Sequence, residues 1–157
     1  MKNFQNKTKI IKVSKIIQHI LFAGLVLWVG LGIPIALLQA FNLWNKIGSP
    51  AALYLQGGAI VMLLLSFTVN LKLFRFFDRL KNGNLFDAQT IGYLAGAGKW
   101  WVMFSIVEGL FYAVGQEFFK IGQAWSFGGL FAGLTLIFVA WLLKEAQELQ
   151  EEQELTV

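Results

Sequence analysis

The hydrophobic pattern of the chain consists of four long apolar segments, at residues 16–45, 47–71, 91–116 and 121–143. The first, second and fourth contain no charged residue, whereas the third contains Lys99 and Glu108. A helix that spans a bilayer needs about 20 mostly apolar residues, so each segment is long enough. The pattern predicts an all-α protein with four transmembrane helices in one bundle, and a single domain over residues 1–157.

The first apolar segment follows a basic arm, residues 1–15, and this order is also found in secretory signal peptides. Its apolar run is longer than the roughly 7–15 residues of a signal-peptide core, which favours a retained helix. Pro34 lies inside the segment and removes a backbone hydrogen bond. We therefore expect a kink near that position.

The distribution of Lys and Arg predicts the orientation. The arm has five lysines, and the connector between the second and third segments, residues 72–90, has four basic residues. The two other connections have one each, Lys46 and Lys120. Because basic residues favour the cytoplasmic side, we expect the arm, the connector and the acidic tail, 144–157, to lie in the cytoplasm.

Composition supports the bilayer as the solvent for this chain. Hydrophobic residues make up 57% and aromatic residues 15% of it, and the mean hydropathy is +0.61. The net charge of +4 does not indicate nucleic acid, because the basic residues lie between apolar segments. With no cysteine and one histidine, and with neither a GxSxG nor an HExxH motif, we expect no metal, no cofactor, no catalytic residue and no enzymatic activity.

The two ionisable residues of the third segment are candidates for a function inside the bundle. A carboxylate such as Glu108 is costly within a spanning helix and has to be protonated, paired or facing water. Lys99 lies nine residues away, on the opposite face of the helix, and we expect it to reach the headgroups instead. A structural hydrogen bond and a proton or ligand site both remain open for Glu108.

The connector alternates basic residues with Leu and Phe through Leu80, which predicts that the second helix continues along the inner interface. Residues 81–84 then predict a turn, and Asp87 is the expected N-cap of the next helix. A basic link needed only for topology is the simpler interpretation, with a partner protein or anionic lipid as the alternative. The candidate contacts are Lys72, Arg75, Arg79, Lys81, Phe86 and Asp87.

Small residues suggest where helices meet. Gly92 and Gly96, and again Gly129 and Gly133, have the four-residue spacing that lets two spanning helices approach closely. The third and fourth helices are therefore expected to pack tightly, within one chain or in a homo-oligomer. The tail, with five glutamates, is expected to continue the last helix into the solvent, and His19 is interpreted as an interfacial, solvated residue in preference to a pH sensor.

Two stretches, GNLFDAQTIGYL at Gly83–Leu94 and AQELQEEQELTV at Ala146–Val157, resemble a bacterial membrane protein family known as domain of unknown function 2975 (DUF2975). Its pattern is a G-x-[LP]-F element before the third helix and an acidic end closing in Leu-Thr-[IV]. Gly83, Leu85 and Phe86 match the first element, and Glu154, Leu155, Thr156 and Val157 match the second.

The resemblance implies four helices and a location in the bacterial plasma membrane, but no catalytic residues. Members of the family are often encoded beside small helix-turn-helix regulators, which implies a membrane component that binds a cytosolic transcription factor. Our first hypothesis is a non-enzymatic signalling or regulatory protein acting through its cytoplasmic surfaces. The alternative is a small transporter or a membrane-protective or immunity protein that uses Glu108.

Overall fold

The computed structural model describes residues 2–35, 37–38, 41–42, 50–84, 87–120 and 127–155. These residues are helical apart from short turns and contain no strand. The helices are α1 (Lys2–Leu27), the π-helix η1 (Trp28–Gly32), α3 (Pro50–Lys81), α4 (Ala88–Phe119) and α5 (Gly128–Leu155). The predicted all-α fold is confirmed.

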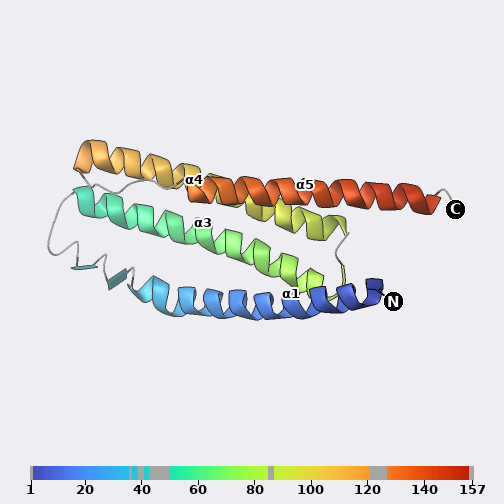
Figure 1. Ribbon diagram of the computed structural model, residues 1–157. Helices are drawn as coiled ribbons and strands as arrows, with labels where there is room; N and C mark the ends of the chain where they lie inside the picture. Colours follow the sequence, from blue (N-terminus) through green and yellow to red (C-terminus); the bar gives the residue numbers. More distant parts are fainter. Residues whose placement is uncertain are drawn as a thin grey trace.

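The helices run alternately up and down and form an elongated molecule (Figure 1). Close backbone contacts join consecutive helices: α1 packs on α3, α3 on α4, and α4 on α5. Among the described residues, α1 makes no such contact with α4 or α5. The start of α1 and the end of α5 lie at the same end of the molecule (Figure 1).

Among the residues that the structure describes, four helical segments are long and apolar enough to cross a membrane, as predicted: Thr8–Ile35, Leu53–Lys81, Ala88–Phe119 and Gly128–Gln153. Many of their large apolar side chains are exposed, including Phe118 and Phe131, as expected for lipid-facing positions. At about 1.5 Å per residue these helices are longer than the roughly 30 Å hydrocarbon layer. A helix of this length tilts within a bilayer or extends beyond it. This is the architecture of a multi-pass membrane protein.

The first helix is irregular at the predicted depth. The hydrogen-bond ladder widens to a π-helix over Trp28–Gly32, where the Ile33 amide donates to the Trp28 carbonyl. Pro34 follows directly and has no amide hydrogen to donate. A widened turn beside a proline is a recognised way of accommodating the lost bond.

The last helix meets α4 through a close backbone approach. A Cβ atom built on Gly133 would lie 2.8 Å from the Val102 amide nitrogen and 2.9 Å from the Gly98 carbonyl oxygen. A Cβ on Gly129 would lie 2.3 Å from Ser105 Oγ. The predicted tight packing of these two helices is therefore present, and Gly98 is its member on α4.

Gly92 and Gly96 lie off this contact. A Cβ on Gly92 would meet nothing within 4 Å, and one on Gly96 would touch only the side chain of Lys72 on α3. Gly92 precedes Gly98 by six residues, which places it about 120° around the helix from the α5 contact. Spacing alone therefore identified the helix pair but selected glycines on other faces of α4.

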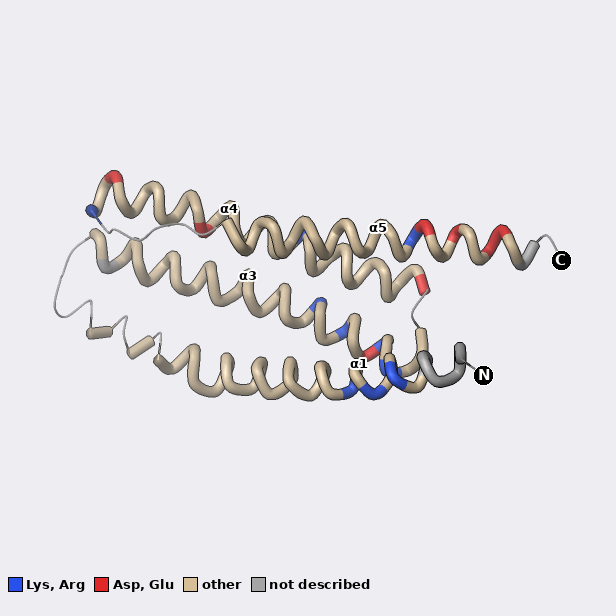
Figure 2. Tube along the Cα trace, viewed as in Figure 1, with Lys and Arg blue, Asp and Glu red and all other residues tan. Residues whose placement is uncertain are grey.

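Buried apolar side chains gather where α3 ends and α4 begins. Phe76 and Leu80 of α3 pack with Ile91 and Leu94 of α4 and with Ala140 of α5. Lys and Arg of α1 and α3, and the glutamates of the tail, lie towards the same end of the molecule (Figure 2). We call this the charged end, defined by residues 9–19, 72–84, 87–93 and 144–153. The buried apolar cluster that joins α3, α4 and α5 thus lies beside the surface that carries the charges (Figure 2).

Candidate functional site

The turn between α3 and α4 is fixed by its own backbone. The amides of Asn82 and Gly83 donate to the carbonyl oxygens of Arg79 and Leu80 at 3.0 Å. Gly83 has a φ of 84°, in the left-handed region that glycine adopts without steric penalty. The turn predicted at residues 81–84 is confirmed, whereas Phe86 lies outside the described residues.

Asp87 joins the two helices. It has extended backbone angles and its Oδ1 accepts from the Gln89 amide at 3.4 Å, so the predicted N-cap is confirmed. Its Oδ2 lies 2.7 Å from Nη1 of Arg79 on α3, and Nη2 of Arg79 also donates to the Gln89 side chain. One arginine therefore ties the end of α3 to the first turn of α4.

Replacing Asp87 with alanine is expected to destabilise the start of α4 by about 1 kcal/mol through the lost cap, and by up to about 1 kcal/mol more through the lost ion pair. Replacing it with asparagine keeps a capping oxygen and removes only the charge. Hydrogen exchange of the first-turn amides of α4 measures the effect. Exchange should rise strongly in Asp87→Ala and slightly in Asp87→Asn; equal rates in both variants would contradict the capping role.

Tyr93 contacts two of the predicted basic residues, Lys72 and Arg75. Nζ of Lys72 and Cζ of Arg75 lie 5.7 and 5.9 Å from the centre of its ring, within the range of cation–π attraction. The Tyr93 hydroxyl also accepts from Nε2 of Gln89 at 3.2 Å. Sequence reasoning missed Tyr93, because its contacts with Lys72 and Arg75 depend on how α3 and α4 face each other.

A separate polar contact joins α1 to α3. Nε2 of Gln18 donates to Oδ1 of Asp78 at 2.7 Å, and Nζ of Lys81 lies 2.7 Å from the same oxygen. Gln18 and Ser14 are buried, and their four-residue spacing marks the face of α1 that packs on α3. Sequence reasoning missed both Gln18 and Asp78. Two polar residues at helical spacing beside Lys15 were the available signal.

The two ionisable residues inside α4 are not brought together. Lys99 is exposed and Glu108 is half-buried, as the nine-residue spacing predicts for opposite faces. Glu108 shares its face with the fully buried Thr90 and Ala97, which lie 18 and 11 residues before it. Glu108 therefore lies on the side of α4 that packs on its neighbours, about 20 residues beyond the helix start at Ala88.

The acidic tail is a continuation of α5, which remains helical to Leu155. Its side chains are exposed or half-exposed from Lys144 to Gln153. Nζ of Lys144 lies 3.2 Å from Oε1 of Glu148. Spacings of three and four residues place Glu145, Glu148 and Glu152 along one stripe of the helix. The tail thus presents a pre-formed acidic surface beyond the packed part of the molecule.

This arrangement suits binding by charge. Basic groups on α1 and α3 and acidic groups on α5 are held on a rigid framework at one end. Within the described residues, no group of three or more His, Asp or Glu side chains is placed to hold a metal ion.

A comparison with known protein families shows where the chain belongs. A family model described as "Protein of unknown function (DUF2975)" matches residues 51–157, which cover α3, α4 and α5 and the connections between them. No curated protein and no solved structure match the chain.

Proposed function

This chain belongs to the DUF2975 family of proteins of unknown function, and we propose that it is a non-enzymatic membrane protein that regulates a cytosolic partner through its charged end. In this proposal the four apolar helices cross the bacterial plasma membrane, and both termini face the cytoplasm. The basic groups of α1 and α3 then lie on the side that basic residues favour. The partner we propose is a small helix-turn-helix regulator.

The observation that supports this function best is the acidic stripe on the helical tail. Glu145, Glu148 and Glu152 stand on a helix that continues without interruption from the last apolar segment. The cluster of Phe76, Leu80, Ile91, Leu94 and Ala140 anchors that helix just before the stripe begins. The stripe is therefore held at a fixed position relative to the rest of the charged end.

The chemistry of the stripe favours a basic partner. Proteins that bind DNA carry clusters of Lys and Arg on the face that meets the phosphates. A row of carboxylates presents the opposite charge to such a face and competes with DNA for it. Charge complementarity of this kind increases association rates and selects partners. Binding at the tail would thus hold the regulator at the membrane and away from DNA.

The test asks whether the detergent-solubilised full chain captures a purified helix-turn-helix regulator. The regulator is one that is encoded beside the gene of this chain. We expect the triple variant Glu145→Gln, Glu148→Gln, Glu152→Gln to capture it about tenfold more weakly. The matched control is Glu117→Gln, at the other end of α4, which should capture like the wild type. Duplex DNA should compete with the wild-type chain for the regulator.

Two results would overturn the proposal. One is equal capture of the regulator by the triple variant and by the control, which would show that the tail is not the binding surface. The other is simultaneous binding of the regulator to DNA and to the chain, which removes the competition. Because the three glutamates are exposed and the substituted glutamine is a good helix former, loss of capture in the variant would not arise from unfolding.

A second candidate function is transport or membrane protection through Glu108. The supporting observation is its place on the same face as the buried Thr90 and Ala97, which turns an ionisable group towards the packed side of α4. Glu108→Gln separates the two candidates. If it abolishes a transport or resistance phenotype while capture of the regulator is absent in every form of the chain, the second candidate replaces the first.

A further inference from the structure

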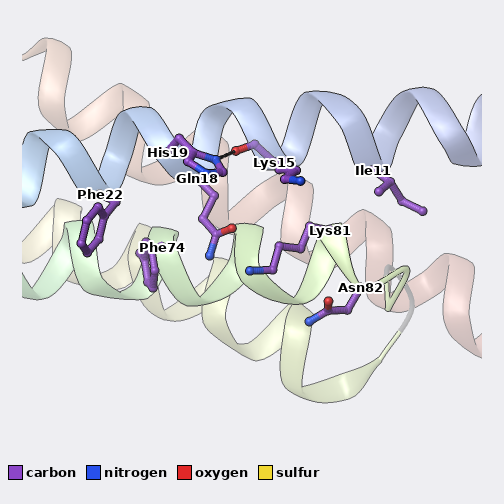
Figure 3. A pocket seen from close by; sticks show the side chains of 8 residues that line it. All are labelled: Ile11, Lys15, Gln18, His19, Phe22, Phe74, Lys81 and Asn82. Carbon is purple, nitrogen blue, oxygen red and sulfur yellow. Dashed lines mark hydrogen bonds between the residues drawn. The ribbon is translucent and has the colours of Figure 1, made fainter.

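A groove opens between α1 and α3 at the charged end, with a volume of about 670 Å³. Phe22 of α1 and Phe74 of α3 form its apolar part, with their ring centres 6.2 Å apart, whereas Ile11 lies beyond Lys15 at the other end of the groove (Figure 3). Lys15 and His19 of α1, with Lys81 and Asn82 from the end of α3, form its polar part (Figure 3). The groove is thus divided into an apolar and a basic half.

The groove lies where the first helix changes from polar to apolar. Lys15 is the last charged residue before the uncharged run of α1 begins, and its side chain is exposed. The aromatic pair lies one to two turns further along α1, towards the apolar segment. In a bilayer the basic half of the groove would stand at headgroup level and the apolar half at the level of the first acyl carbons.

The basic half has hydrogen-bond donors to offer. Nζ of Lys81 gives one contact to Oδ1 of Asp78 and, as an ammonium with three hydrogens, retains others. Lys15 forms no ion pair with any residue that the structure describes. Nδ1 of His19 lies 2.6 Å from the Lys15 carbonyl oxygen and donates its hydrogen there, which makes Nε2 an acceptor, so the donors of the groove are Lys15, Lys81 and Asn82.

Asp78 of α3 lies beside the groove, and its Oδ1 already accepts from both Gln18 and Lys81. Figure 3 shows Gln18 and Lys81 reaching towards each other from the two helices. Two lysines against one aspartate leave an excess of positive charge. An anion that enters the groove would therefore meet donors and net attraction, and its apolar remainder would meet Phe22 and Phe74.

We propose that this groove binds an anionic glycerophospholipid, with the headgroup phosphate at Lys15, Lys81 and Asn82 and an acyl chain along Phe22 and Phe74. Basic pockets between membrane helices on the cytoplasmic side are suited to such lipids. The apolar half distinguishes a lipid from free phosphate, which would leave the two aromatic rings without a partner. The bound lipid would fill the space between α1 and α3, and this role is independent of any protein partner.

The test is native mass spectrometry of the full chain, released from nanodiscs that contain phosphatidylglycerol and phosphatidylcholine in equal amounts with identical acyl chains. We expect the wild type to retain phosphatidylglycerol preferentially. Lys15→Gln should lower that preference about fivefold, as expected for one basic residue at a lipid surface. The control Lys9→Gln, which removes an exposed lysine on another face of α1, should keep the wild-type preference.

Three results would overturn the proposal. Equal retention of the two lipids by the wild type would show that the chain does not select the anionic lipid. Equal lipid preference in the Lys15 and Lys9 variants would show that the lipid does not bind in the groove. Displacement of the lipid by inorganic phosphate, or by a peptide of residues 144–155, would assign the groove to a free anion or to the acidic tail. None of these results bears on capture of the regulator, which is tested by the tail variants.

Discussion

Replacing Gly133 by alanine is expected to destabilise the contact between α4 and α5 by about 1–3 kcal/mol, the usual effect of overpacking a close contact. The added Cβ would lie 2.8 Å from the Val102 amide nitrogen and 2.9 Å from the Gly98 carbonyl oxygen. Both are backbone atoms, which no change of side-chain rotamer can move. The two helices would have to separate, and the contact of Gly129 with Ser105 would be weakened too.

The matched control is Gly92→Ala on α4, because a Cβ at Gly92 would meet nothing within 4 Å. Both substitutions raise helix propensity equally, so the difference between them reports packing alone. Reversible unfolding of the purified chain in mixed micelles measures both free energies. Gly92→Ala should be neutral or stabilising, and Gly133→Ala clearly destabilising. If the two variants unfold alike, the close approach of α4 and α5 is wrong.

The sequence predicted well the features that depend on neighbouring residues. Uncharged runs of more than 20 residues identified three of the four helices, and α4 was identified from a long, mostly apolar run that contains Lys99 and Glu108, because length and polarity decide whether a segment can span. Asp87 was identifiable as an N-cap because a capping side chain bonds an amide two residues away. The turn at Gly83 was predictable because a turn depends on residues that are adjacent in the sequence, and turn-forming residues cluster there.

Contacts between distant residues were beyond the sequence. Gln18 and Asp78 are 60 residues apart, and nothing local to either indicates the other. The sequence also did not show which face of α4 is turned towards α5. Gly98 was therefore missed as the residue that meets Gly133. Both depend on how two helices face each other, which residue spacing within a single helix does not specify. The groove between α1 and α3 was missed for the same reason.

The central claim of this account is that the charged end lies in the cytoplasm, where a regulator and an anionic leaflet are both available. The chain has no cysteine, so a single introduced cysteine reports its own side of the membrane. Asn82 in the turn and Glu148 in the tail are exposed at the charged end, and Glu117 is exposed at the other end of α4. These three positions therefore report on both ends of the molecule.

The decisive measurement is labelling of the variants Asn82→Cys, Glu148→Cys and Glu117→Cys with a membrane-impermeant maleimide, in intact and in permeabilised cells. The account predicts labelling of Glu117→Cys in intact cells, and labelling of the other two only after permeabilisation. Labelling of Asn82→Cys or Glu148→Cys in intact cells would contradict it, because the charged end would then face away from the cytoplasm.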